Sequence, residues 1–204
     1  MPLVALAGLA LYGLLAFGLR SLVHRRRTGS SGFRGVSGPP GSVEWWGGVL
    51  FGVALAAAVA APLAELTGLV APSARLATPP VYATGITLCL AGLGGTLWAQ
   101  FAMGDSWRIG VDDAERTALV GRGPFRLVRN PIYTSMLAAM LGFALLTPNT
   151  VAAAALGVLV AALELQVRFV EEPYLVRGHG ARYRAYAAQT GRFLPGIGRL
   201  AGGA

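Results

Sequence analysis

Five apolar runs dominate the sequence and constrain the fold that it can adopt. The hydrocarbon core of a bilayer is about 30 Å thick, so a helix needs roughly 20 apolar residues to cross it. Only 13% of the 204 residues are charged, about half of the share found in soluble domains. We therefore expect an all-α integral membrane protein with about five transmembrane helices. The runs cover residues 3–23, 45–70, 81–103, 132–146 and 150–167.

The ends of the runs indicate how the helices connect. Only Thr147-Pro148-Asn149 separates the last two runs, and a turn this short predicts an antiparallel helical hairpin. The first run has no basic segment before it and three arginines after it, at 25–27. We therefore interpret it as a retained helix and not as a cleaved signal peptide.

The basic residues predict the orientation in the membrane. All 17 are arginine, and every one except Arg75 flanks the runs on one side. The positive-inside rule then places the N-terminus outside and the C-terminus in the cytoplasm. The composition, rich in Ala, Gly and Arg, favours a bacterial inner (plasma) membrane. Membrane lipids with anionic headgroups suit this surface, nucleic acid is not an expected partner, and the oligomeric state stays open.

Metal chemistry is not expected. Cys89 is the only cysteine, and His24 and His179 are the only histidines. A single cysteine excludes a disulfide within the chain, and the set is too small for a cluster of Cys or His ligands. Residues 28–42 are rich in Gly, Ser and Pro without periodicity, which predicts a flexible cytosolic loop.

A first polar cluster precedes the fourth run. Gly121 and Gly123 flank Arg122 and permit a tight turn with a ligand close to the backbone. No predicted strand precedes them and no third glycine follows, so they do not form a dinucleotide-binding fingerprint. Asn130 and the proline after it suit the N-cap and first turn of a helix. A capping turn alone explains this pair, but a helix N-terminus also favours anions, so a ligand carboxylate would fit there.

A second polar cluster lies at the end of the fifth run. Glu164, Arg168 and Glu171 or Glu172 follow i, i+4, i+7/8 spacing, which predicts one shared helix face. An ion-pair stripe at the membrane interface is one interpretation. Two acids near a helix C-terminus are unfavourable for the helix dipole, however, which favours a role in binding ribose hydroxyls or an amino group. Pro173 is expected to end this helix, with an amphipathic surface helix after it.

Together these motifs resemble the isoprenylcysteine carboxyl methyltransferase family, which is related to the membrane phospholipid methyltransferases. The resemblance covers roughly residues 107–195 and rests on the order of several motifs. Asn130 stands where the family has histidine, and Ser135 stands where glycine is common. The motifs are Gly123-Pro-Phe125-Arg126, Arg129-Asn130-Pro131-Ile-Tyr133, Glu171-Glu172, Gly180-x-x-Tyr183-x-x-Tyr186 and Pro195.

The resemblance implies a pocket for S-adenosyl-L-methionine on the cytosolic side, closed by the C-terminal region. The methyl acceptor, a lipophilic small molecule or lipidated substrate, would enter from the lipid. Residues 1–104 would form three transmembrane helices with a cytosolic loop at 24–44, and residues 105–204 the cofactor-binding region. Arg168 and Arg129 are the catalytic candidates. The implied cofactor-binding residues are Thr117, Ala118, Leu119, Val120, Gly123, Phe125, Asn130, Pro131, Ile132, Tyr133, Glu171 and Glu172.

The chemistry of methyl transfer bears on the acceptor. A sulfonium is already an activated methyl donor, so alignment and exclusion of water supply much of the acceleration. A carboxylate acceptor needs no general base, whereas an amine or thiol has to lose a proton. With no histidine base near the motifs, the sequence favours a carboxylate or an already ionised acceptor.

Two other functions remain open at the level of sequence. Sterol reductases are similar in the C-terminal region and use NADPH there, although they are usually much larger. A non-catalytic membrane protein that binds a small molecule is the second alternative, with the Arg and Glu side chains forming only structural pairs.

Overall fold

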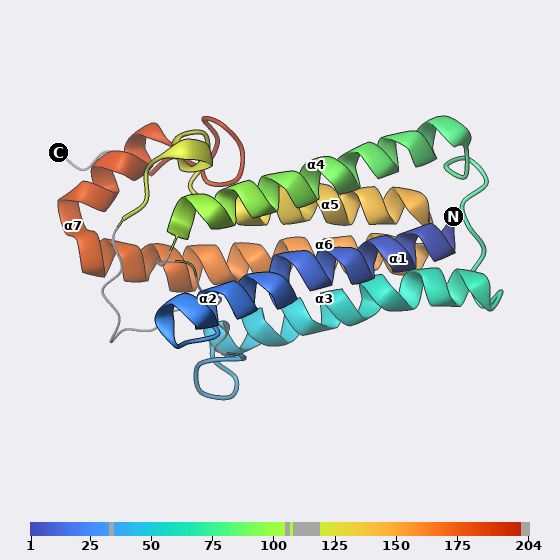
Figure 1. The fold of residues 1–204 in the computed structure, drawn as a ribbon, viewed down its shortest axis with the longest axis horizontal. Helices are drawn as coiled ribbons and strands as arrows, with labels where there is room; N and C mark the ends of the chain where they lie inside the picture. Colours follow the sequence, from blue (N-terminus) through green and yellow to red (C-terminus); the bar gives the residue numbers. More distant parts are fainter. Residues whose placement is uncertain (33–34, 105–106, 108–118, 201–204) are drawn as a thin grey trace.

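The structure is a computed structural model that describes residues 1–32, 35–104, 107 and 119–200. The described residues form helices and loops and no strand, which confirms the all-α expectation. Figure 1 shows the long helices side by side in an elongated bundle. In chain order the elements are α1 (Pro2–Tyr12), the π-helical η1 (Gly13–Leu19), α2 (Arg20–Thr28), α3 (Val43–Leu66), α4 (Pro79–Met103), the short 3-10 helix η3 (Gly123–Arg126), α5 (Pro131–Leu146), α6 (Thr150–Leu165), the π-helical η4 (Gln166–Glu171) and α7 (Glu172–Gln189).

The lengths of the helices fit a bilayer. Among the described residues, four continuous helical stretches are long and apolar enough to cross a membrane: Pro2–Thr28, Val43–Leu66, Pro79–Met103 and Thr150–Gln189. The apolar α5 has 16 residues, about 24 Å at 1.5 Å per residue. Figure 1 shows α4 and α6 running in the same direction with α5 returning between them, so α5 has to cross with its neighbours. The chain is an integral membrane protein.

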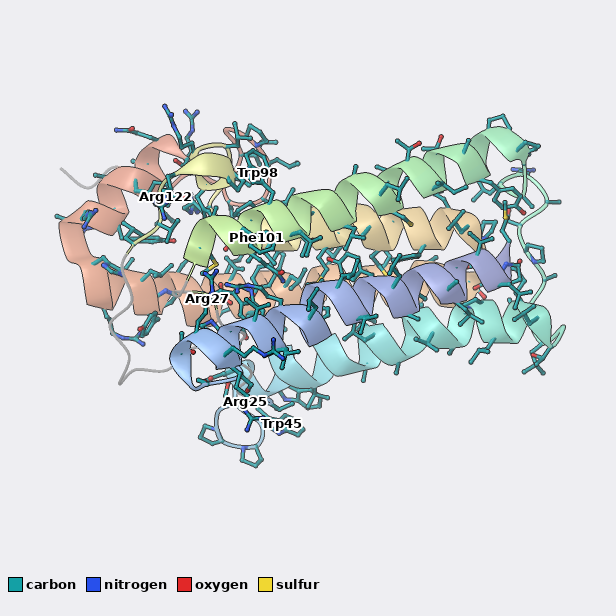
Figure 2. All side chains as sticks on the ribbon, in the orientation of Figure 1. Arg25, Arg27, Trp45, Trp98, Phe101 and Arg122 are labelled. Atoms are coloured by element: carbon teal, nitrogen blue, oxygen red, sulfur yellow. The ribbon has the colours of Figure 1, made fainter. Side chains whose placement is uncertain are left out.

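One end of the bundle carries the positive charge. We call it the basic end; it holds α2, η3 and α7, and the loop that contains Arg75 lies at the opposite end (Figure 1). Figure 2 shows Arg25, Arg27 and Arg122 at this end together with Trp45 and Trp98. Tryptophan and arginine side chains are typical of a membrane–water interface.

Helices α4 and α5 pack closely because small residues face each other. A Cβ atom added to Gly92 would lie 2.6 Å from both Ala139 N and Ser135 O, and one added to Gly142 would lie 2.6 Å from Gly85 O. Membrane helices associate through such small residues, which let the backbones approach. This contact fixes the position of α5 and of the segment that enters it.

The predicted hairpin between α5 and α6 is present, and its turn also contacts α3. Asn149 Oδ1 accepts a hydrogen bond from Ala152 N at 3.0 Å, which caps α6. Asn149 Nδ2 donates to Ala61 O in α3 at 3.1 Å. Helices α3, α5 and α6 share a core of small and apolar side chains that includes Ala58, Met140 and others.

The expectation that Pro173 ends the helix is wrong. The chain stays helical from α6 through η4 into α7. Pro173 lies in the first turn of α7, just after a π-helical segment whose bonds run from i to i+5, and a first-turn proline is tolerated. The direction changes instead at Gly180, where φ is 52° and ψ is −127°, a conformation that glycine adopts at little cost.

Candidate functional site

The segment that enters α5 pairs with the C-terminal tail. Arg129 N donates to Gly191 O at 2.8 Å, and Asn130 N donates to Arg192 O at 3.1 Å. Asn130 and Pro131 occupy the N-cap and first position of α5, as predicted, but the Asn130 side chain does not cap the helix. Its Nδ2 donates to Arg192 O at 3.2 Å. The tail is thereby held against the start of α5.

A buried ionic cluster strengthens this attachment. Glu172 Oε1 accepts from Arg129 Nη2 at 2.6 Å, and the Glu172 carboxylate accepts from Arg192 Nε and Nη2, each at 2.8 Å. Arg129 and Glu172 are each 6% exposed. Arg129 also donates to Ala187 O at 3.1 Å and to Gly198 O at 2.9 Å. Both predicted site residues, Arg129 and Glu172, therefore position the tail.

The positive charge of Arg192 in this cluster is stable to pH. The hydrogen bond to Glu172 raises the pKa of the Arg192 guanidinium above its ordinary value, and the partial burial of Arg192 does not offset that effect. Arg192 consequently stays protonated at any pH at which the protein is studied.

A second contact joins the two polar clusters found in the sequence. The Tyr133 hydroxyl, from the first turn of α5, donates to Glu171 Oε1, at the end of η4, at 2.6 Å. Tyr133 and Glu171 are 38 residues apart in the chain, so only the packing of α5 against the α6–η4 helix brings them together. The start of α5 and the end of η4 form one site.

These residues surround a cavity of about 410 Å³ at the basic end, a volume within the range of small-molecule sites. Ten of the residues predicted from sequence line it: Leu119, Val120, Phe125, Arg129, Asn130, Pro131, Ile132, Tyr133, Glu171 and Glu172.

The other four predicted site residues are not among the residues that line the cavity. Gly123 and Arg168 do not line the cavity. The Arg168 side chain is 52% exposed and pairs with Glu164, one helical turn earlier. Arg168 therefore lies on the outer surface of η4 with Glu164, whereas Glu171 and Glu172 line the cavity. Thr117 and Ala118 lie outside the described residues.

Sequence reasoning missed the wall of the cavity that α3 provides. Glu44, Gly47, Phe51 and Gly52 line it, although the sequence predicts a cytosolic loop at Glu44 and only a transmembrane segment at the other three. An available signal was an acid at the head of an apolar run, followed by glycines at helical spacing on the same face.

The cavity wall includes a buried polar atom that has no hydrogen-bond partner among the described residues. Gln100 is 1% exposed and lines the cavity. Its Nε2 donates to Ala16 O at 2.8 Å, whereas its Oε1 accepts no hydrogen bond from the described residues. Leaving such an atom unsatisfied costs about 1–3 kcal/mol. A ligand with an N–H or O–H group would remove this penalty.

Aromatic side chains cover the cavity from α7. Tyr183 and Tyr186 line it, with ring centroids 6.2 Å apart. The Tyr186 hydroxyl donates to Phe125 O at 2.6 Å, which fixes α7 to the turn before α5. The cavity thus combines carboxylates, an amide and aromatic faces, a set able to bind a polar molecule that carries a flat ring.

Comparison with known protein families shows to which family the chain belongs. Residues 80–182 match the phospholipid methyltransferase (PEMT) family, which is just over half of the 204 residues. The chain belongs to the phospholipid methyltransferase family. No curated protein and no solved structure matches it. The match runs from the start of α4 into α7, so the family segment contains the start of α5 and the end of η4. The resemblance to the related isoprenylcysteine carboxyl methyltransferases fits this membership.

Proposed function

We propose that the protein is a membrane methyltransferase that uses S-adenosyl-L-methionine to methylate a lipophilic acceptor. One observation carries this proposal: Asn130 and Glu171, from the two polar clusters, line the same cavity, and Tyr133, which also lines it, donates a hydrogen bond to Glu171. When bound, S-adenosyl-L-methionine supplies a methyl group already activated by its sulfonium. The protein then needs mainly to align the acceptor and exclude water.

The residues of the cavity fit the chemical groups of this cofactor. After Pro131, the first turn of α5 carries the N–H groups of Ile132 and Tyr133, and a helix N-terminus favours a carboxylate. Glu171 offers acceptor oxygens for ribose hydroxyls or an amino group. The aromatic faces of Tyr183 and Tyr186 suit an adenine ring. Arg129, paired with Glu172, would hold the C-terminal tail over the bound molecule.

This proposal divides the work between the two parts of the chain. Residues 105–204 would supply the cofactor side of the cavity, and residues 1–104 would supply the acceptor side through α3. The basic end would face the cytoplasm of a bacterial cell, with the N-terminus outside, because arginines are retained on the cytoplasmic side. A cofactor made in the cytosol would then have direct access.

Cofactor binding to the detergent-purified protein tests the proposal. We expect S-adenosylhomocysteine to bind in isothermal titration calorimetry and NADPH not to bind. Binding of NADPH alone would favour the membrane reductase. Binding of neither compound, by a protein that unfolds cooperatively, would leave only a non-catalytic role.

A further inference from the structure

A tight turn lies in the C-terminal tail, after α7. Ile197 N donates to Leu194 O at 3.1 Å, and Gly196 has a φ of 77°. A proline followed by a glycine with positive φ is typical of a type II turn. We call the segment Leu194-Pro195-Gly196-Ile197 the tail turn. Its backbone is fixed by this geometry, so the two apolar residues at its ends are held in place.

The tail turn is attached to the first turns of a transmembrane helix. Thr134 Oγ1 in α5 donates to Phe193 O at 2.7 Å, and Asn130 N donates to Arg192 O at 3.1 Å. Phe193 packs against the core that α3, α5 and α6 share. The chain from Arg192 to Phe193 therefore follows α5 from Asn130 towards Thr134, which is the direction of the membrane interior.

The packing of α4 on α5 gives the depth of this attachment. A Cβ atom added to Gly95 would lie 3.2 Å from Ser135 Cβ, so the residue next to Thr134 is level with Gly95. Trp98, at the basic end (Figure 2), lies about 4.5 Å further along α4, away from the membrane interior. Tryptophan is typical of the membrane–water boundary. Phe193, bonded to Thr134, therefore lies at the depth of this boundary.

The apolar residues of the tail turn are exposed at this depth. Leu194 is 54% exposed and Ile197 is 63% exposed, as much as the boundary residue Trp98 at 55%. A guanidinium accompanies them, because Arg199 Nη2 would lie 3.6 Å from a Cβ atom added to Gly196. Apolar side chains beside a guanidinium fit the zone in which acyl chains meet lipid phosphates.

We propose that the tail turn is a membrane-binding surface, with Leu194 and Ile197 inserted among lipid acyl chains and Arg199 at the lipid phosphates. The bilayer is the partner because the turn continues the lipid-facing surface of α4 and α5 at the same depth. This contact forms whatever molecule the cavity binds, so the inference does not rest on the proposed function.

The same contact connects the bilayer to the cavity. Arg129 Nη2 donates to Gly198 O, directly after the tail turn, at 2.9 Å. Arg192, just before the turn, pairs with Glu172 at 2.8 Å. Arg129 and Glu172 line the cavity. A movement of the tail turn out of the bilayer has to displace both attachments, so lipid stabilises this wall of the cavity through the tail.

Fluorescence quenching by lipid measures the insertion. Cys89 is the only cysteine, so Ile197→Cys in a Cys89→Ala background carries one bimane label on the full chain, in nanodiscs of phosphatidylcholine and phosphatidylglycerol. Lipids with a nitroxide near the top of the acyl chain are expected to quench this label as strongly as a label at Trp98→Cys. Ala185→Cys, at an exposed position of α7, is the control and is expected to be quenched several-fold less.

Two results of this measurement overturn the proposal. One is quenching at Ile197→Cys that is no stronger than at Ala185→Cys. The other is excimer emission from a pyrene label at Ile197→Cys without quenching by lipid, which would assign the surface to a second copy of the chain.

Hydrogen exchange in the same nanodiscs tests the connection to the cavity. Leu194→Asp is expected to lower the protection of the Asn130 amide, which donates to Arg192 O, about tenfold or more, because a half-exposed leucine that leaves the acyl chains loses about half of its transfer free energy. Leu194→Met keeps an apolar side chain and is expected to keep the protection. Unchanged protection in Leu194→Asp, or an equal loss in Leu194→Met, overturns the stabilisation of the tail by lipid.

Discussion

Replacing Glu172 with glutamine is expected to loosen the C-terminal tail from the start of α5. Glu172 is 6% exposed and accepts hydrogen bonds from Arg129 at 2.6 Å and from Arg192 at 2.8 Å. Removing one partner of a buried ion pair costs about 3–5 kcal/mol because the other charge stays buried. Glutamine keeps one acceptor oxygen, so we expect the lower value, about 3 kcal/mol, for the free energy of local opening.

Hydrogen exchange measures this opening. The amides of Arg129 and Asn130, which donate to the tail, and of Leu200, which donates to Ala187 O at 3.1 Å, should lose about a hundredfold in protection, since 1.36 kcal/mol corresponds to a factor of ten. Glu164→Gln is the matched control. Its pair with Arg168 is exposed on both sides, and such pairs contribute about 1 kcal/mol or less. Unchanged protection in Glu172→Gln, or an equal loss of protection in Glu164→Gln, would refute the conclusion that the Arg129–Glu172–Arg192 cluster holds the tail against the start of α5.

Three further substitutions probe the cavity and the bundle. Glu171→Gln is expected to weaken S-adenosylhomocysteine binding about tenfold or more in calorimetry, through the loss of a charged acceptor; unchanged affinity would remove Glu171 from the cofactor site. Arg168→Ala is expected to leave that affinity unaltered, since Arg168 lies outside the cavity; a fall in methyl transfer alone would support the catalytic role that the family resemblance implied for Arg168. Gly92→Ala should lower the free energy of unfolding in detergent by about 1–3 kcal/mol, because its Cβ would lie 2.6 Å from Ala139 N. Gly94→Ala is the control, because a Cβ atom added there would meet nothing within 4 Å. An equal loss of unfolding free energy in Gly94→Ala would argue against close packing of α4 on α5.

The parts of the site that depend on local rules were predictable from the sequence. A proline after Asn130 set the start of α5, and the family resemblance implied that Tyr133 and Glu171 line one pocket. The contact made by the Asn130 side chain was not predictable, because Arg192 reaches it only through the folded tail. A partner about 60 residues away leaves no periodic signal.

The π-helical segment η4 explains the placement of Arg168. The prediction that Glu164, Arg168 and Glu171 or Glu172 share one helix face assumes 3.6 residues per turn. The segment Gln166–Glu171 is π-helical, with hydrogen bonds that span five residues instead of four. Each turn there holds more residues, so the residues that follow point in other directions than a regular α-helix would give them. Arg168 stays with Glu164, while Glu171 and Glu172 turn towards the cavity.

The wall provided by α3 was hidden for a different reason. Phe51 and Leu55 have the same hydrophobic character whether they face lipid, a core or a cavity, so hydropathy identifies the span and not the function of each face. Only the packing of α3 against α6 and η4 shows which face is left open to a ligand.

A structure of the protein with bound S-adenosylhomocysteine tests the central claim most directly. We predict that the nucleoside occupies the cavity between the start of α5 and the end of η4, with Asn130 and Glu171 both in contact with it. A nucleoside bound elsewhere on the protein, with either residue out of contact, would contradict the account.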